Sequence, residues 1–479
     1  MTAAENRARW IALYVLCLGD LMIVVDMTIV NVALPSIRDD LGFSETSLAW
    51  VVNAYLLTFG GFLLLGGRLG DLFGQRRLFL LGISLFTAAS ILCGVATSQG
   101  LLLAARAIQG LGGAVVSAVA LSLIMGLFTE TADRAKAMGV FGFCMAGGGS
   151  VGVLLGGVLT DTLSWHWCFW VNVPVGVAVT FLTLRLLPGT PGRADTGRLD
   201  VAGAITVTGS LMLAVYAIVN GNDQGWLSGQ TLGLLAGAVV LLTAFAAIES
   251  RVAAPLMPLA ILKLRNIWAS NVVGILWAAG MFAFFFLSAL YLQLVLGYSP
   301  LQVGLAFLPA NIIMGAFSLG ISAKLVMRFG IKPPLAVGFV LASASLFLFA
   351  RAPVDGNFAM DVLPAMILLG LGAGMAFNPV LLAAMSDVKP EDSGLASGVV
   401  NTAFMMGGAL GLAVLASLAD WRTNNLGSAK DLSALTSGYH LAFVVGAIFT
   451  LAAAVVGALL LHSPAPQAMP AGEPATENA

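Results

Sequence analysis

The sequence predicts an all-α membrane protein, and two observations predict it. Of the 479 residues, 59% are hydrophobic and only 9% are charged, whereas an ordinary soluble domain carries roughly 25% charged residues. The apolar runs are continuous over about 20 residues, the length that crosses a bilayer as a helix. A membrane barrel would instead show segments of about 10 residues with alternating polarity. The sequence therefore predicts a bundle of transmembrane helices.

Hydropathy predicts 14 membrane spans in all. The spans are expected near residues 10–36, 47–66, 78–97, 101–127, 137–160, 168–187, 201–220, 229–248, 267–296, 301–322, 335–352, 359–385, 394–418 and 439–461. If both termini are cytoplasmic, 17 of the 22 Lys and Arg residues fall in inside loops, 4 fall in outside loops, and Arg106 remains in the membrane. Loops rich in Lys and Arg stay on the cytoplasmic side, so both termini are predicted to be cytoplasmic.

The chain also repeats itself at a nearly constant offset. Three glycine-containing segments recur after 256, 260 and 259 residues. The pairs begin at Gly74 and Gly330, at Gly110 and Gly370, and at Gly148 and Gly407. A constant offset indicates a duplicated unit, here six spans in each half with two extra spans between them. Such duplications are typical of transporters whose site lies between the two halves, near the midplane.

This 6 + 2 + 6 arrangement divides the chain into five regions. We expect a cytoplasmic N-terminus (1–9), a six-helix bundle (10–187), a linker with two extra transmembrane helices (188–266), a second six-helix bundle (267–461) and a disordered cytoplasmic tail (462–479).

Two charged residues lie inside predicted spans of the first half. Asp26 is about 16 Å and Arg106 about 9 Å below the outer ends of their spans, a difference that an extended arginine can cover. The pair is either a static contact that orders the helices or a proton-exchanging site, because burial favours the neutral carboxyl whereas contact with Arg106 favours the carboxylate. Asp20 lies about 9 Å deeper than Asp26 and is a possible accessory acid. Ionisable groups inside a membrane are costly and usually functional.

Three motifs resemble those of the major facilitator superfamily. The loop after the second span resembles the signature loop of that family, and the resemblance implies a cytoplasmic latch, formed by Gly67, Asp71, Gly74, Arg76 and Arg77. A basic loop that only sets topology is the alternative. The segment from Arg106 through Gln109 to Gly113 resembles the proton-transfer motif. The fifth span resembles the antiporter motif, with packing glycines at Gly148, Gly152, Gly156 and Gly157, although Val153 replaces the motif's proline.

Further segments are similar to the fourteen-helix drug:proton antiporters of that superfamily. Asp26 to Pro35 resembles their first-helix motif, and Trp165 to Gly176 resembles the junction of their fifth and sixth helices, with His166 where arginine is usual. The segment from Gly394 through Asn401 also fits, but Phe404 and Met405 replace an expected Arg-Gln pair.

The resemblance implies a proton-coupled exporter of drugs or antibiotics in the bacterial cytoplasmic membrane. It would act as a monomer, with an amphipathic small molecule, protons and the lipid bilayer as partners, and with no cofactor, metal, nucleic acid or enzymatic activity. Candidate pocket residues are Asn31, Asn53, Asn271, Gln293, Asn311, Asn378 and Asn401, although a polar residue in such a span more often forms just a hydrogen bond between helices. A narrow exporter of one metabolite and a proton symporter remain alternatives, whereas the sequence contains no nucleotide-binding loop or catalytic triad.

Overall fold

The computed structural model describes residues 3–128, 130–187, 189, 200–252, 255, 257, 260–386, 388, 393–428 and 430–462, and the regular structure of this part is entirely helical. The long helices are α1 (Ala3–Leu41), α2 (Glu45–Phe73), α3 (Gln75–Gly94), α4 (Gln99–Leu127), α5 (Thr131–Thr162), α7 (Asn172–Leu186), α8 (Val201–Gln224), α9 (Gly229–Glu249), α10 (Arg265–Leu290), α11 (Pro300–Ala316), α13 (Lys332–Phe349), α14 (Leu363–Met385), α15 (Ser393–Leu426) and α16 (Leu432–Leu460). The short segments are α6 (Trp167–Trp170), α12 (Ser322–Phe329), η1 (Ile261–Lys263), η2 (Tyr291–Val295), η3 (Phe317–Ile321) and η4 (Phe358–Val362). The expected tail at 463–479 lies outside the described residues.

Hydroxyl caps fix the start of several helices. At the start of α2, Ser47 N donates to Ser44 Oγ at 3.1 Å, and Ser44 N donates to Ser47 Oγ at 2.9 Å. Ser299 and Gln302 form the same reciprocal pair at the start of α11. Such capping boxes satisfy backbone donors that the first helical turn leaves free.

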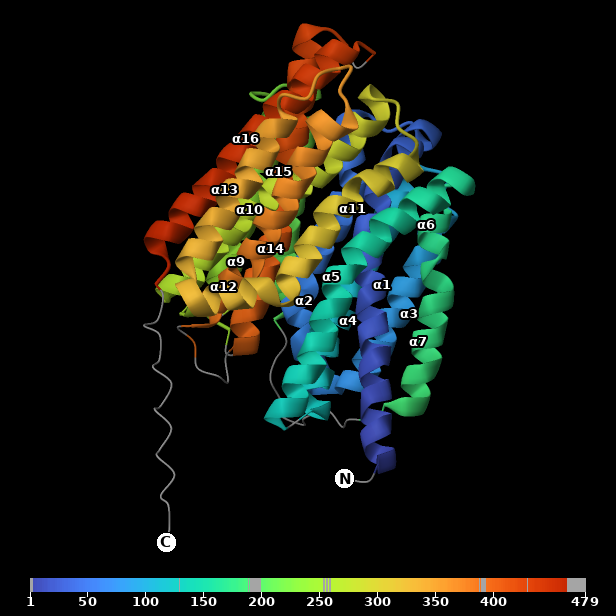
Figure 1. Cartoon of the computed structure of the whole chain (residues 1–479), viewed down its shortest axis with the longest axis vertical. Helices are drawn as coiled ribbons and strands as arrows, with labels where there is room; N and C mark the ends of the chain where they lie inside the picture. Colours follow the sequence, from blue (N-terminus) through green and yellow to red (C-terminus); the bar gives the residue numbers. More distant parts are fainter. Residues whose placement is uncertain are drawn as a thin grey trace.

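The two halves pack their helices in the same order. In the first half α1 packs on α5 and α7, and α4 packs on α2 and α3. In the second half α10 packs on α15 and α16, and α14 packs on α11 and α13. The helices run roughly alongside one another, and α1 begins at the same lower end of the molecule at which α16 ends (Figure 1).

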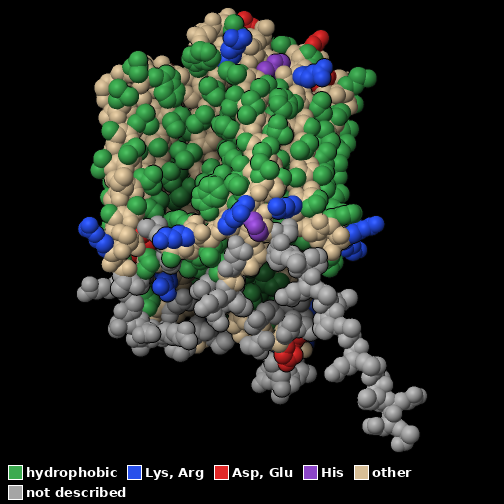
Figure 2. All heavy atoms as spheres, turned by 90° about the vertical axis from the view of Figure 1, so that its left-hand side faces the viewer, with side chains coloured by type: hydrophobic (Ala, Val, Ile, Leu, Met, Phe, Trp, Pro, Cys, Tyr) green, Lys and Arg blue, Asp and Glu red, His purple; other side chains and the backbone are tan. Residues whose placement is uncertain are grey.

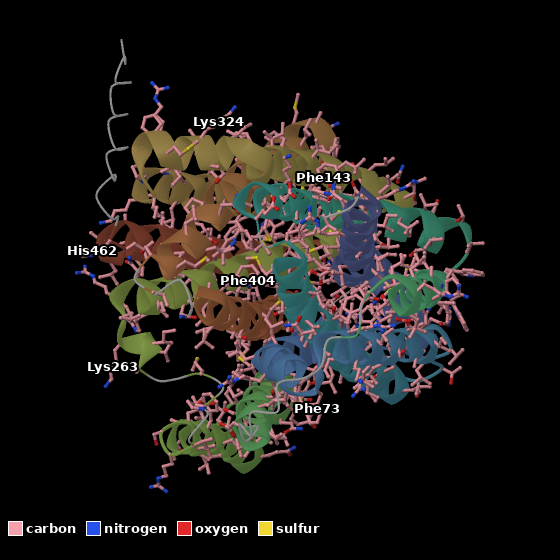
Figure 3. All side chains as sticks on the ribbon, turned by 90° about the horizontal axis from the view of Figure 1, so that it is seen from below. Phe73, Phe143, Lys263, Lys324, Phe404 and His462 are labelled. Carbon is pink, nitrogen blue, oxygen red and sulfur yellow. The ribbon has the colours of Figure 1, made fainter. Side chains whose placement is uncertain are left out.

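The halves meet along two helix pairs, α2 with α15 and α5 with α11. Helix α8 packs against both α2 and α15, and α9 packs on α8. Viewed from the lower end, this extra pair lies at the edge of the molecule, outside the other helices (Figure 3). The extra helices therefore border one of the two seams between the halves.

Thirteen helices of the described part are long and apolar enough to cross a membrane. The span expected at 301–322 differs, because α11 ends at Ala316 and the chain bends at Gly320, where φ is 166° and ψ is −23°, before α12 begins. The apolar crossing is thereby divided, which leaves α11 as a shorter apolar helix. The span expected at 168–187 is confirmed as one membrane-length helix, Trp167–Leu186, in which Val171 joins α6 to α7 with helical dihedral angles.

The surface carries a wide band of hydrophobic side chains. Lys and Arg side chains gather along the lower edge of this band and again at its upper end (Figure 2). Large apolar residues such as Val239 and Val240 of α9 are each more than 60% exposed. A surface of this kind faces lipid, since soluble monomers rarely expose apolar patches of such extent.

Candidate functional site

Asp26 and Arg106 form a buried ion pair between α1 and α4. Arg106 Nη1 lies 2.6 Å from Asp26 Oδ2, and the two side chains are 1% and 0% exposed. The salt bridges at Arg9–Asp133 and Arg38–Asp39, by contrast, lie outside the buried interior. A pair so deeply buried depends on further hydrogen bonds to offset the cost of removing both charges from water.

Those hydrogen bonds come from three helices, α2, α4 and α7. Gln109 Nε2 and Asn172 Nδ2 each donate to Asp26 Oδ1 at 2.7 Å. Arg106 also donates to Gln109 Oε1 at 2.7 Å and to the backbone oxygen of Val51 at 3.0 Å. Every contact to the carboxyl group is thus a donor, which suits an ionised Asp26 and leaves Oδ1 with both acceptor positions used. We refer to Asp26, Arg106, Gln109 and Asn172 as the carboxylate cage.

A second layer holds the cage in place. Gln109 Nε2 donates to Ser90 Oγ on α3 at 2.8 Å. The guanidinium of Arg106 lies 4.4 Å from the centre of the Tyr55 ring and 5.7 Å from that of Phe169. Aromatic faces attract cations, and more strongly where water is excluded. The two rings therefore stabilise Arg106 on the side away from Asp26.

Glycines allow the surrounding helices to approach closely. A side chain at Gly110 would collide with the backbone oxygen of Tyr55, and a Cβ at Gly112 would lie 2.7 Å from Phe86 N. Small residues at such positions allow α2 and α3 to lie against α4. The backbone of Val51 and the ring of Tyr55 thereby reach Arg106.

The glycines of α5 make the close approach to α1 that their spacing predicts. A Cβ at Gly148 would lie 2.9 Å from Leu21 and Val24, and a Cβ at Gly156 would lie 2.5 Å from the backbone oxygen of Ile29. Gly152 lies between them, against Val25 and Thr28. Gly157 faces the other half, with its Cβ position 2.8 Å from the backbone oxygen of Pro300. Because the buried Val153 replaces the motif's proline, no proline kinks α5, which runs without interruption from Thr131 to Thr162.

Asp20 lies apart from the cage, nearer than Asp26 to the N-terminal end of α1. It is 3% exposed and accepts a hydrogen bond from Ser117 Oγ of α4. Within the described part of the chain it forms no ion pair.

The loop between α2 and α3 reaches a neighbouring helix end. Gly74 ends α2 and starts α3 with a φ of 94°, a conformation that favours glycine. Arg76 Nη2 donates to the backbone oxygen of Leu184 at 2.8 Å, in the last turn of α7. Arg77 is exposed, and Gly67 lies beside Ala118 of α4. The side chain of Asp71 lies outside the described residues, so the full latch stays a prediction.

The candidate pocket residues separate into distinct environments. Gln293 Nε2 donates across the two halves to the backbone oxygen of Val32 at 2.9 Å. Asn271 and Asn401 instead bond within their own helices, to Ile267 O at 2.8 Å and to Ser397 Oγ at 3.5 Å. Asn53 and Asn311 are buried, and each has amide atoms without a hydrogen-bond partner among the described residues. Asn31 and Asn378 are half-buried in α1 and α14.

Asn401 also lines a small, mostly apolar pocket in the second half. The lining residues are Gly274, Trp277, Phe377, Val380, Leu381, Val400, Asn401 and Phe404. Trp277 is 1% exposed, and its Nε1 donor has no partner among the described residues. Phe404 lies near the middle of the molecule in the view from the lower end (Figure 3). The pocket therefore combines aromatic surface with one unused donor and one amide, as small-molecule sites often do.

His166 lies at the outer junction between α5 and α6. Its ring stacks on Trp165 with centroids 3.7 Å apart. Burial lowers the pKa of His166, and the nearby Asp40 raises it only in part. An uncharged imidazole at neutral pH thus occupies the place where arginine was expected, so the positive charge is lost there.

Sequence reasoning missed three residues of this site. Asn172 belongs to the segment that resembled a subfamily motif, but its side chain was not assigned to the ion pair. Ser90 and Tyr55 lie on α3 and α2 without any motif to mark them. The packing of α2 and α3 on α4 decides which of their residues reach the ion pair, and the sequence does not show this packing directly.

The fold and the buried charge pair define a multi-pass membrane transporter. The chain matches the family model of the Major Facilitator Superfamily over residues 16–412 and belongs to that superfamily. It is 40% identical to the puromycin resistance protein pur8 of Streptomyces alboniger, over 95% of this chain and 92% of that protein. It is 37% identical to the cephamycin export protein CmcT of Amycolatopsis lactamdurans, over 94% and 92%. It is 36% identical to a lincomycin resistance protein of Streptomyces lincolnensis, over 87% and 85%.

Solved structures show the same fold. The nucleoside transporter NupG (D323A mutant) is similar with a TM-score of 0.65 at 12% identity, over 93% of this chain and 98% of that one. The xylose transporter XylE from E. coli, in an inward open conformation, is similar with a TM-score of 0.64 at 15% identity, over 96% and 98%. The protein is thus a multi-pass protein of the bacterial cytoplasmic membrane, with the fold of this superfamily.

Proposed function

We propose that this transporter exports antibiotic-like, amphipathic molecules across the cytoplasmic membrane in exchange for protons. The observation that carries the proposal is the carboxylate cage, a fully buried acid whose charged partner among the described residues is Arg106. Export is supported by the relatives, whose names are puromycin resistance, cephamycin export and lincomycin resistance proteins. Exchange with protons rests on the chemistry of Asp26.

Coupling follows from two environments for one carboxyl group. With Arg106, Gln109 and Asn172 in contact, all donors favour the ionised form. When the helices move and Arg106 withdraws, a desolvated Asp26 binds a proton. Protonation from the outside and release to the inside would then drive the substrate in the opposite direction.

The substrate would bind between this cage and the pocket of the second half. Trp277 and Asn401 supply a donor and an amide, while Phe377 and Phe404 supply aromatic surface. Such a lining suits a molecule with a flat or apolar body and a few polar groups. Selectivity for one metabolite, the rival proposal, would require more fixed polar contacts than this pocket offers.

In the same proposal the chain crosses the membrane 14 times in a 6 + 2 + 6 order, with both termini in the cytoplasm. The broken crossing of α11, η3 and α12 would add one span to the thirteen membrane-length helices and so complete the 14. Arg9 and Asp133, whose side chains meet at 2.5 Å, would lie at the cytoplasmic ends of α1 and α5. The regions 10–187 and 267–461 would be the two moving bundles, and the latch residues would act at the cytoplasmic end.

The structure would then represent a state closed towards the outside. Gln293 of η2, which follows the outer end of α10, donates to Val32 of α1, and Gly157 lies against Pro300 at the outer ends of α5 and α11. In the cytoplasmic half of α5, no atom lies within 4 Å of the Cβ positions of Gly139 and Gly142, and Phe143 is 59% exposed. Along the α5–α11 seam, the closer contact at the outer end supports closure towards the outside.

The test is efflux of puromycin, lincomycin, a cephamycin and a cationic dye from a host that lacks its own efflux pumps. Asp26→Asn and Arg106→Ala should abolish efflux that depends on an imposed proton gradient. Asp133→Asn removes an ion pair outside the cage and serves as the matched control, which should retain efflux. If both cage variants export as well as the parent, the coupling assignment is wrong. If uptake rises when the outside is acidified, the protein is a symporter.

A further inference from the structure

Tyr55 connects the carboxylate cage with Asp20. Its ring lies 4.4 Å below the guanidinium of Arg106, and its side chain is 0% exposed. Its hydroxyl group has no hydrogen-bond partner among the described residues. Because this hydroxyl is not used by another described group, it is free to donate and accept in a proton transfer.

The hydroxyl lies beside Gly113 of α4, one helical turn before Ser117, which binds Asp20. The Tyr55 oxygen lies 3.0 Å from the position that a Cβ of Gly113 would take. Gly113 and Ser117 are one turn apart on the same face of α4, and Ser117 Oγ donates to Asp20. Both Asp26 and Asp20 act electrostatically on the Tyr55 hydroxyl. The hydroxyl thus lies between the two acids in depth.

Asp20 has the surroundings of an acid that exchanges a proton. It is buried, has one hydroxyl donor and makes no ion pair within the described part of the chain. The titratable groups that face it are Cys17 of its own helix and Tyr55 of α2, while Cys144 of α5 faces Cys17. No cation among these groups compensates a permanent negative charge, which would be expensive inside a membrane.

We propose that Asp20 is a second proton site on the inner side of Asp26, and that Tyr55 relays the proton between them. This inference rests on the proposed coupling role of Asp26. In the transfer, the Tyr55 oxygen accepts the proton that Asp26 releases, while the hydroxyl proton of Tyr55 passes to the Asp20 carboxylate. Tyr55 is neutral before and after. Asp26 ends ionised beside Arg106, and Asp20 ends neutral.

Gly113 belongs to this arrangement because it leaves room for the hydroxyl. A methyl group there would meet the Tyr55 oxygen at 3.0 Å and the Phe59 ring at 3.2 Å, so one of them must shift. The glycine of the span-four motif therefore serves the relay as well as helix packing.

The first experiment follows carboxyl groups directly and needs no substrate. The full-length protein in lipid nanodiscs is titrated from about pH 9 to about pH 5, and the infrared C=O band of protonated carboxyl groups is recorded. Asp20→Asn should remove one component and Asp26→Asn another. If Asp20→Asn leaves the band of the parent unchanged, the second site is wrong. If Asp26→Asn leaves it unchanged, the proposed function fails instead.

The second experiment tests the relay by a rapid drop in pH. Tyr55→Phe keeps the ring that packs on Arg106 and Phe59 and removes only the hydroxyl. It should slow the Asp26 component by about tenfold or more and leave the Asp20 component fast, which a merely structural role would not do. Tyr439→Phe removes another buried hydroxyl without a described partner, in the second half, and should change neither rate. Equal rates of the Asp26 component in Tyr55→Phe and the parent would overturn the relay.

Discussion

Asp26 and Asn172 are 146 residues apart in the sequence, and their side chains meet with 2.7 Å between Oδ1 and Nδ2. Asn172 is the first residue of α7, and Val171 between α6 and α7 keeps helical dihedral angles (φ −60°, ψ −26°). The helical backbone from Trp167 to Leu186 therefore carries the amide of Asn172 to the buried carboxylate. The carboxylate of Asp26 thus accepts hydrogen bonds from α7 as well as from α4.

Removing this amide should change the pH dependence of transport. Asn172→Ala leaves Asp26 Oδ1 with Gln109 as its single donor, and a hydrogen bond to a charged group contributes about 1.5–3 kcal/mol. Fewer donors to the carboxylate favour the neutral acid, so the pH profile of efflux should move upwards by about one pH unit.

The profile is measured as efflux rate against pH with a fixed substrate. Asn220→Ala is the control: among the described residues its amide donates to Tyr216 O within α8, so this variant should keep the profile of the parent. An unchanged profile in Asn172→Ala would show that the amide does not act on Asp26.

Two glycines of α5 should respond in opposite directions to the same substitution. Gly156→Ala places a methyl group 2.5 Å from Ile29 O and should lower stability by about 1–3 kcal/mol. At Gly139 no atom lies within 4 Å of the Cβ position, so Gly139→Ala should raise stability by about 0.5–1 kcal/mol through helix propensity. Thermal unfolding of the purified variants measures both, and a stabilising Gly156→Ala would contradict the described packing.

The pocket of the second half should set substrate range without affecting coupling. Trp277→Phe keeps an aromatic ring and removes the Nε1 donor, so compounds that accept this bond should bind about tenfold more weakly, as loss of about 1.4 kcal/mol implies. Binding is measured by fluorescence titration with each exported compound. Uniform affinity for all compounds in Trp277→Phe would exclude a direct contact.

The extra helices should depend on one amide at the outer end of α8. Asn222 Nδ2 donates to Ser417 O at 2.8 Å and to Asp420 Oδ2 at 3.1 Å, both in α15. Asn222→Ala should destabilise this seam by about 1–3 kcal/mol and expose the α8–α9 pair to limited proteolysis. Cleavage at the rate of the parent would show that the amide does not hold α8 in place.

The fold class and the ion pair could be predicted because they depend on local signals. Continuous apolar runs identify membrane helices, and a charge within such a run is rare enough to mark Asp26 and Arg106 individually. The glycines of α5 were likewise predictable, because their spacing places Gly148, Gly152 and Gly156 on one face.

The remaining parts depend on contacts between distant segments. The ring of Tyr55 and the amide of Asn172 reach Arg106 and Asp26 only after α2 and α7 have packed. The bend at Gly320 interrupts a run that hydropathy reads as one span, because hydropathy does not register backbone dihedral angles. The amide bonds within α10 and α15, at Asn271 and Asn401, could not be distinguished from bonds between helices for the same reason.

The central claim is that Asp26 couples export to protons, and transport in proteoliposomes tests it most directly. Parent and Asp26→Asn proteins are reconstituted with an antibiotic that the parent exports, and two rates are measured: exchange of labelled for unlabelled compound, and accumulation driven by a proton gradient. The account predicts that Asp26→Asn retains exchange and loses gradient-driven accumulation. Accumulation by Asp26→Asn at the level of the parent would contradict it.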